Sequence, residues 1–252
     1  MADDRTISAR GGGQVPCLSC AARASLLCSG MQDADLPALY AHARPIRLKR
    51  GQPLIMEGDE AERVYNVRAG HMMLSRLVED GRRQVLAFIG IGDYVGHTVA
   101  PTYSFSAEAL SDVLLCGFER SGLETLIGQY PGFERQFRRM TTVILEDSLD
   151  LIVALGRKNA LERLCSFLLL MANRERRRGG GADIAPLPMT RADIADFLGL
   201  TLETVSRTFS RLKRAGLIVT EGADRVRLVD PVRMAAIAEG GQALTGPVAD
   251  PL

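Results

Sequence analysis

The stretch TRADIADFLGLTLETVSRTFSRLKRAGLI, residues 190–218, predicts two short helices joined by a tight turn. Thr190 and Asp193 have the spacing of a capping box, in which the side chain of each residue accepts a hydrogen bond from the backbone N–H of the other. Gly199 ends this first helix, because glycine readily adopts the left-handed conformation that closes a helix. Thr201 then caps a second helix. Two helices connected in this way form a helix-turn-helix.

The second helix, expected to run to about Ala215, has one apolar and one polar face. The apolar face carries Leu202, Val205, Phe209 and Leu212. The polar face carries Glu203, Ser206, Arg207 and Ser210, with Arg211 behind them. Four cations and one anion between positions 202 and 215 give this helix a local charge of +3, as expected for contact with DNA phosphates. An arginine can bind guanine through two hydrogen bonds, and a glutamate can accept one from cytosine.

Two short strands are expected directly after this helix. The segments Leu217–Thr220 and Arg225–Val229 flank the turn residues 221–224 and indicate a β-wing. Taken alone, the polar face of the second helix would also fit a solvated amphipathic helix. The capped helix before it and the wing after it favour a DNA-reading helix.

Between residues 46 and 119 the pattern changes to short apolar stretches separated by glycine-containing turns. Asp80-Gly81 lies between the stretches Met72–Val78 and Gln84–Ile89 and is a strong signal for a hairpin. Many short strands at regular spacing predict an antiparallel sandwich or roll.

The chain is then expected to be helical from Gly132 to about Arg174. One face of this segment carries a narrow stripe at steps of three and four residues. The stripe comprises Thr141, Leu145, Ser148, Ile152 and Leu155. A stripe of this width suits a partner helix, so we expect a dimer of two copies of the chain. Packing of this helix on the chain's own roll is the alternative.

Bulk composition excludes several classes of protein. The 252 residues are 46% hydrophobic and 24% charged, which is ordinary for a soluble globular protein, and the net charge is only +1. No apolar run approaches the roughly 20 residues that a membrane span needs. The N-terminus lacks the apolar region of a signal peptide. We therefore expect a cytoplasmic protein with no membrane partner.

The five cysteines are an odd number, which argues against a disulfide framework. Cys17, Cys20 and Cys28 have the spacing C-x2-C-x7-C, and thiolates of this kind bind zinc or iron–sulfur clusters. A fourth ligand must come from elsewhere. Cys116 and Cys165 each lie in an apolar segment, where a cysteine usually acts as a small buried hydrophobe.

An exchanging dithiol of a redox enzyme is a further interpretation of Cys17 and Cys20. However, no βαβ pattern surrounds the pair, and that interpretation leaves the helix-turn-helix unused. We therefore do not expect an enzyme.

The whole arrangement resembles the Crp/Fnr superfamily of transcription regulators, and the resemblance covers nearly the whole chain. It rests on the order of roll, long helix and reader, and on a Glu-x-x-Ser-Arg signature like that of the Fnr branch. The resemblance implies an α+β fold with an N-terminal antiparallel β-roll (a jelly-roll-like double-stranded β-helix), a long dimerisation helix and a C-terminal winged helix-turn-helix. It also implies a palindromic site of the type TTGAT-N4-ATCAA. Arg207 would contact the guanine, Glu203 the opposite-strand cytosine and Ser206 a thymine.

Relatives that sense cyclic AMP end a phosphate-binding segment in Arg-Ser/Thr-Ala. Here the matching residues are Phe105, Ser106 and Ala107, so a phenylalanine stands where an arginine would neutralise the phosphate. A buried phosphate without a cationic partner is costly. We therefore expect no cyclic nucleotide, with Phe105 filling the roll.

The resemblance also implies a metal site. Oxygen sensors of the Fnr type hold a [4Fe-4S] cluster with three N-terminal cysteines and one cysteine in the roll. The implied ligands are Cys17, Cys20, Cys28 and Cys116. In that family oxygen degrades the cluster, the dimer loosens and DNA is released. A zinc ion or another small ligand in the same fold is the alternative.

From these features we predict five segments along the chain. They are a cluster-binding segment (1–30), a β-roll sensor domain (31–135), a dimerisation helix (136–160), a winged helix-turn-helix (161–235) and a flexible tail (236–252). The expected partners are double-stranded DNA, a second copy of the chain and RNA polymerase. The family implies that exposed roll loops such as Glu79–Arg83 and Val99–Tyr103 meet the polymerase.

Overall fold

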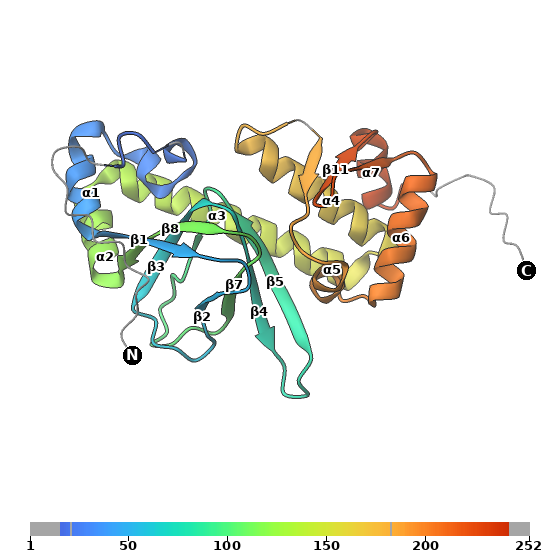
Figure 1. Cartoon of the computed structure of the whole chain (residues 1–252), viewed down its shortest axis with the longest axis horizontal. Coiled ribbons are helices and arrows are strands. Elements are labelled where there is room, and N and C mark those ends of the chain that lie inside the picture. The colour runs from blue at the N-terminus through green and yellow to red at the C-terminus, as the bar shows by residue number, and fades with distance from the viewer. Residues whose placement is uncertain (1–15, 21, 182, 242–252) are drawn as a thin grey trace, which may run out of the picture. The chain divides into compact units, whose positions relative to one another are not determined.

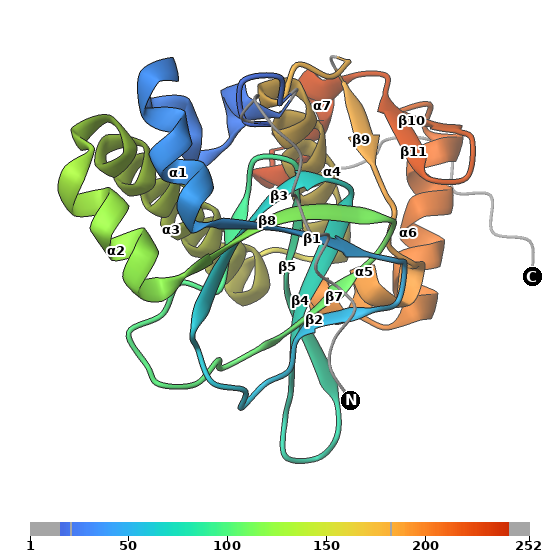
Figure 2. The same cartoon turned by 60° about the vertical axis from the view of Figure 1, so that its left-hand side comes forward.

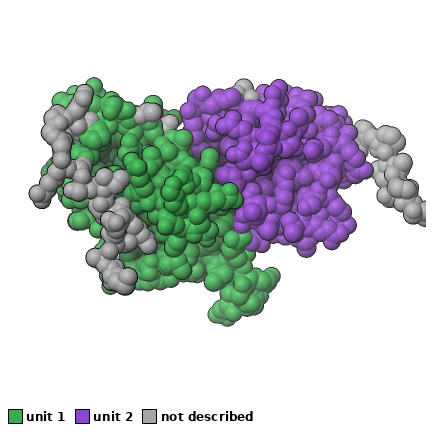
Figure 3. Space-filling view, in the orientation of Figure 1, with its two compact units in different colours: residues 1–146 green, residues 147–252 purple. Residues whose placement is uncertain are grey.

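The computed structural model describes residues 16–20, 22–181 and 183–241. The chain divides into two compact units, residues 1–146 and 147–252 (Figure 3). One long helix, α3 (Pro131–Arg157), continues from the first unit into the second. The predicted α+β class is confirmed, as is the order of roll, long helix and winged helix-turn-helix.

Antiparallel strands of the described residues form the roll in the first unit (Figure 1). They are β1 (Ala43–Leu48), β2 (Pro53–Ile55), β3 (Arg63–Ala69), β4 (His71–Leu77), β5 (Arg83–Gly90), β6 (Tyr94–Val95), β7 (Ser106–Ala109) and β8 (Val113–Glu119). They pair into two sheets with the orders β1-β8-β3-β6 and β2-β7-β4-β5. The hairpin predicted at Asp80-Gly81 is confirmed, because β4 pairs with β5 across it and Gly81 has a φ of 82°.

Alternation along the strands creates two separate cores. Side chains of a strand point to opposite faces in turn. On β3 and β8, Val67 and Leu115 face the core between the two sheets. Their neighbours Val64 and Phe118 face a second core on the outside of the roll. The roll therefore offers one of its outer faces as a packing surface.

Short helices cover that outer face. They are the 3₁₀ turns η1 (Arg23–Ser25), η2 (Leu27–Gly30) and η3 (Asp33–Asp35), and the helices α1 (Leu36–His42) and α2 (Arg120–Gln129). Figure 2 shows α1 and α2 side by side at one end of the roll. The turn η3 leads directly into α1, and Pro37 in the first turn of α1 suits a helix start.

The second unit contains the helix-turn-helix and its wing. Its elements are α4 (Ala160–Arg177), β9 (Ile184–Pro186), α5 (Arg191–Leu198), α6 (Leu202–Arg214), β10 (Ile218–Glu221), β11 (Arg225–Leu228) and α7 (Pro231–Ala238). The predicted capping box of Thr190 and Asp193 is confirmed, and Gly199 closes α5 with a φ of 61°. Thr201 caps α6, as predicted, by accepting a hydrogen bond from the N–H of Thr204.

The continuous helix predicted to about Arg174 is wrong. It is interrupted after Arg157, because Asn159 forms a capping box with Glu162 and starts the separate helix α4. The helix predicted over residues 136–160 accordingly begins earlier, at Pro131, and ends earlier.

The end of the helical segment and the tail also differ from prediction. Beyond the predicted end at about Arg174, α4 continues to Arg177, and Ile184–Pro186 forms the strand β9, which pairs with β11. The tail predicted from residue 236 begins with the last turn of α7 instead, and residues 242–252 lie outside the described part. No helix in the described part of the chain is long and apolar enough to span a membrane.

Candidate cysteine pocket and DNA-reading helix

Four cysteines from two distant parts of the chain line one pocket in the first unit, which we call the cysteine pocket. Its cysteines are Cys17, Cys20, Cys28 and Cys116. The first two lie in a turn, in which the N–H of Cys20 donates to the carbonyl of Cys17 over 3.4 Å. Cys28 lies in η2, and Cys116 projects from the outer face of β8.

The fifth cysteine lies elsewhere. Cys165 is in α4 of the second unit and is completely buried. Strand register explains why Cys116 joins the N-terminal trio: it is one position away from Leu115, which points into the roll, so it points outward.

Arg23 fixes the loop between the second and third cysteines. Its guanidinium pairs with the carboxylate of Asp33 and donates to the carbonyl of Met31 over 2.9 Å. These contacts hold the loop against the chain that follows Cys28. These contacts therefore stabilise the conformation of the segment, whose described part forms turns and short 3₁₀ helices.

Two polar residues of β3 complete the wall of the pocket. Asn66 pairs in register with Cys116, and Arg68 lies two residues further on the same face. Arg68 is half-buried, and its guanidinium lines the pocket with Cys20 and Cys116, so its positive charge acts on both thiols. Neither residue was predicted to belong to the site, because strand pairing and not sequence proximity brings them to the cysteines.

Burial controls the protonation of these thiols. Desolvation raises the pKa of Cys28 to about 12, with further contributions from Cys17 and Cys20. Desolvation also raises the pKa of Cys116, to about 11, against the opposing effect of Arg68. Burial alone would lower the pKa of Arg68, but the neighbouring Cys116 and Cys20 offset this and raise it. Binding of a cation would remove the thiol protons, since thiolates are the metal ligands.

The chemistry of this donor set fits zinc or an iron–sulfur cluster. Four thiols and a guanidinium surround an otherwise mostly apolar pocket, and thiolates select these soft centres over magnesium or calcium. Within the described residues, no group of three or more histidine, cysteine, aspartate or glutamate side chains is arranged to hold a single metal ion.

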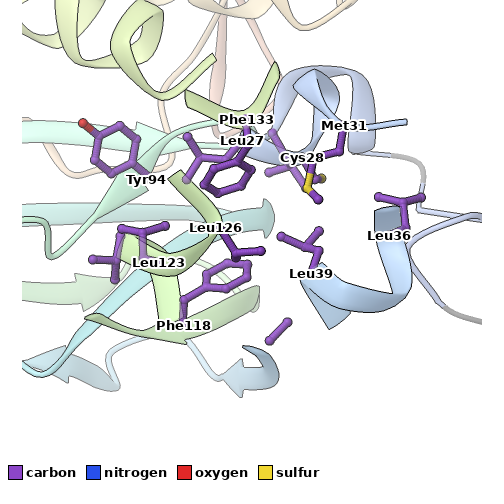
Figure 4. Packing of buried hydrophobic residues seen from close by; sticks show 13 residues of the cluster. Leu27, Cys28, Met31, Leu36, Leu39, Tyr94, Phe118, Leu123, Leu126 and Phe133 are labelled. Carbon is purple, nitrogen blue, oxygen red and sulfur yellow. The ribbon is translucent and has the colours of Figure 1, made fainter. Parts of the chain in front are cut away.

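The cysteine segment shares a core with the start of α3. Cys28 and Leu27 pack with Phe133 of α3, as Figure 4 shows, and all three are buried. The backbones also touch: a Cβ built on Gly132 would lie 1.8 Å from the carbonyl oxygen of Gly30. Only glycine tolerates so close an approach, so the segment and the helix are in direct backbone contact.

The predicted stripe on α3 is mostly exposed. Leu145, Ser148 and Ile152 face solvent in the single chain, and Ile152 has 64% of its surface accessible. Thr141 is exposed as well, and its hydroxyl hydrogen-bonds to the Tyr94 hydroxyl over 2.7 Å. Leu155 is half-buried.

Leu149 and Val153 also lie exposed on α3, and the sequence analysis did not include them. Their spacing in the sequence would have placed them beside the stripe, since Leu149 stands four residues after Leu145 and Val153 four residues after Leu149. The exposed apolar surface of α3 is therefore wider than the predicted stripe.

The reading helix α6 presents its predicted polar residues to solvent. They are Glu203, Ser206, Arg207, Ser210 and Arg211, and all are exposed. Arg207 and Glu203 form an ion pair one turn apart, at 3.3 Å. Both side chains are more than two-thirds exposed, at 71% and 75%, so this pair contributes little and can open for other partners.

The buried side of α6 differs from the prediction in one residue. Val205, Phe209 and Leu212 are buried as expected, but Leu202 is 52% exposed. Leu202 is the first residue of the helix, directly after the Thr201 cap.

Two arginines stabilise the packing of the helices in and around the helix-turn-helix. Arg191 at the start of α5 stacks on Phe209 of α6, with 3.2 Å from its Cζ to the ring centroid. Arg163 of α4 donates to the carbonyls of Leu155 and Leu198, each over 2.8 Å. It thereby links the last turns of α3 and α5. Neither residue was singled out from the sequence, because both act through tertiary contacts.

In the roll, Phe105 is partly buried against the inner core, and its ring centroid lies 6.1 Å from that of Tyr103. The hydrophobic filling predicted for this position is confirmed. Exposed residues occur in both loops assigned to polymerase contact, including Val99 with 92% of its surface accessible.

Known proteins match both halves of the chain. A family model described as a Crp-like helix-turn-helix domain matches residues 162–237, and one described as a cyclic nucleotide-binding domain matches residues 45–130. The chain is 38% identical to the nitrogen fixation regulation protein FixK of Bradyrhizobium diazoefficiens, over 88% of this chain and 93% of that protein. It is 34% identical to the transcriptional activator protein FnrL of Cereibacter sphaeroides, over 86% and 90%. The solved structure of FixK2 from Bradyrhizobium japonicum aligns with a TM-score of 0.70 at 37% identity, covering 77% of this chain and 96% of that one.

Proposed function

The chain belongs to the Crp/Fnr family of DNA-binding transcription regulators, and we propose that it responds to oxygen through a [4Fe-4S] cluster. The ligands would be Cys17, Cys20, Cys28 and Cys116. The cluster supplies an oxygen-sensitive centre when bound. The chain's own residues convert its presence into a DNA-binding state.

One observation carries this proposal: four thiols from segments far apart in the sequence line the same pocket. A structural role for the cysteines alone would not require them to meet. Binding of a common centre would tie the N-terminal segment to strand β8, since each segment contributes part of the ligand set.

The core shared by the cysteine segment and α3 explains how cluster binding would affect the dimer. Leu27 and Cys28 pack on Phe133, and Gly30 touches Gly132 at the start of α3. A displaced cysteine segment would therefore uncover apolar surface on α3 and shift its first turn. The helix also carries the exposed residues Leu145 and Ile152, which we assign to the interface with a second copy.

The dimer would read a palindrome of the TTGAT-N4-ATCAA type with one α6 in each half-site. Arg207 would leave Glu203 to bind guanine, and Glu203 would accept a hydrogen bond from cytosine. Ser206 would contact thymine, while Ser210 and Arg211 lie on the same exposed surface. A monomer reaches one half-site only and loses about half of its phosphate contacts, so it binds DNA far more weakly.

The regulated genes would be those expressed at low oxygen. RNA polymerase would contact exposed loops of the roll, such as the one at Val99.

The deciding experiment is anaerobic purification of the full chain, followed by stepwise admission of air. We expect a broad visible absorbance, iron and acid-labile sulfide in the protein, and DNA binding that is lost together with the colour. A colourless protein that contains zinc and binds DNA equally well in air would exclude the cluster and favour the zinc alternative. A metal-free protein with the same behaviour would leave a regulator that responds to another ligand.

A further inference from the structure

The cysteine pocket contains a buried amide that the protein leaves unsatisfied. Asn66 is 2% exposed, and its Oδ1 has no hydrogen-bond partner within the described part of the chain. Its side chain lines the pocket beside Cys116, its register partner. Buried polar side chains nearly always find a partner, so an orphaned one calls for an explanation.

The surroundings of Asn66 give no structural reason for a polar side chain. The other walls of the pocket include Leu26, Leu39 and Phe118, which would pack equally well against an apolar residue. An unsatisfied buried carbonyl weakens the fold. Asn66 therefore suits a state of the pocket in which a polar group is bound.

Arg68 adds a positive charge to the same wall. It lies on the same face of β3 as Asn66 and lines the pocket together with Cys20 and Cys116. Four thiolates around an iron–sulfur core carry a net negative charge. Burying such a charge in an apolar pocket is costly unless a cation and hydrogen-bond donors face it.

We propose that Asn66 and Arg68 are positioning residues that stabilise the bound cluster. Arg68 offsets its charge through the thiolates of Cys20 and Cys116, and Asn66 donates a hydrogen bond from Nδ2 to a cluster sulfur. Because cluster sulfurs accept hydrogen bonds, they can bind the carboxamide only through Nδ2, and a half-turn about its last torsion brings Nδ2 to the position of Oδ1. This inference rests on the proposed cluster and assigns it two contacts beyond the four cysteines.

The test uses the full chain with its cluster assembled without oxygen. The variants are Asn66→Leu, which keeps the branched shape of the side chain, and Arg68→Met, which is unbranched and uncharged. Arg47→Met on the exposed side of β1 is the matched control. We expect both pocket variants to lose iron to a chelator about 10-fold or more faster than the parent, as is typical for residues that support metal ligands. The control should behave like the parent.

Two further readouts separate this role from simple packing. The reduction potential of the cluster should become more negative in both variants, because hydrogen bonds and positive charge favour the added electron. Without the cluster, Asn66→Leu should unfold at the same or a higher denaturant concentration than the parent, because it removes an unsatisfied carbonyl. The rate of iron loss and the stability of the cluster-free protein should thus change independently of each other.

The outcomes are distinguishable. If the parent holds a cluster and Asn66→Leu and Arg68→Met retain iron and potential like the parent, the inference is wrong and the proposed function stands. If the loss of iron only follows a loss of apo stability, the two residues are structural and the inference is also wrong. If the parent itself binds no iron, the proposed function fails and the inference falls with it.

Discussion

The cysteine pocket and the reading helix α6 are built in opposite ways. The residues of α6 that would read DNA lie within nine positions of each other, and all of them are exposed. The pocket joins residues 17–28 to strands β3 and β8 and is largely buried. A local, exposed site can be changed one residue at a time, whereas a shared core transmits each change to its neighbours. We therefore expect α6 to set which DNA is bound and the pocket to set whether DNA is bound at all.

The largest expected effect tests the pocket side of this comparison. Cys116→Ala should abolish the visible absorbance and the bound iron, and it should weaken binding to every DNA sequence equally. Cys165→Ala is the control, since Cys165 is a buried cysteine of the other unit. Absorbance, iron content and a DNA-shift assay without oxygen are the measurements. Loss of the colour in Cys165→Ala alone would reverse the ligand assignment.

A charge placed on the exposed face of α3 should have the second-largest effect. Ile152→Glu places a carboxylate where two copies would pack, and burying that charge without a partner costs several kcal/mol. Sedimentation of the anaerobic protein should show a monomer. Val232→Glu on α7, where the valine is 81% exposed, makes the same change elsewhere and should leave the dimer intact. A dimer in both variants would place the interface on another surface.

A change in base specificity tests the role assigned to α6 in the choice of DNA sequence. Arg207→Ala should cost about 1–3 kcal/mol at one base pair of each half-site and relax the preference for guanine there. Lys213→Ala, further along the same helix, should instead weaken binding to all DNA sequences alike. It should also reduce the slope of log affinity against log salt concentration by about one. Binding to a panel of operator variants at two salt concentrations separates these outcomes. An unchanged base preference in Arg207→Ala would contradict its assigned role.

The glycine contact tests the link between the pocket and α3. Gly132→Ala would bring a Cβ to 1.8 Å from the Gly30 carbonyl, so one backbone must move. We expect a destabilisation of about 1–3 kcal/mol by overpacking, together with weaker cluster retention and a weaker dimer. Gly128→Ala in α2 is the control, because nothing lies within 4 Å of its added Cβ. Equal behaviour of the two variants would mean that the contact does not couple the regions.

The smallest effect is a pH dependence of the cluster-free protein. Burial holds the pKa of Cys28 at about 12 in the folded state, against 9.0 for an ordinary cysteine. Above pH 9 the unfolded chain therefore binds fewer protons than the folded one, and stability contributed by this thiol is lost as the pH rises towards 12. Urea unfolding below pH 9 and near pH 11 should show a smaller decline in Cys28→Ala than in the parent. An identical decline would show that this thiol is not buried in solution.

Sequence reasoning was most successful where neighbouring residues cooperate. The capping box at Thr190, the left-handed Gly199 and the cap at Thr201 all act within one helical turn, so they could be predicted from spacing alone. The break at Asn159 has the same local signal and was overlooked. Leu202 was assigned to the buried face by periodicity, but its position at the end of the helix leaves it exposed.

The amino-acid sequence alone predicted the helix-turn-helix with its wing and the exposed polar face of α6, because each depends on interactions between residues a few positions apart. The resemblance implied Cys116 as the fourth cysteine, and the tertiary structure places it, and not Cys165, in the pocket with the N-terminal three. Only the tertiary structure decided that Asn66 and Arg68 face these cysteines and that Gly30 touches Gly132. Those contacts depend on strand register and on a core shared between distant segments. A shift of one residue in β3 would turn Asn66 and Arg68 to the opposite face of the sheet, and a shift in β8 would do the same to Cys116.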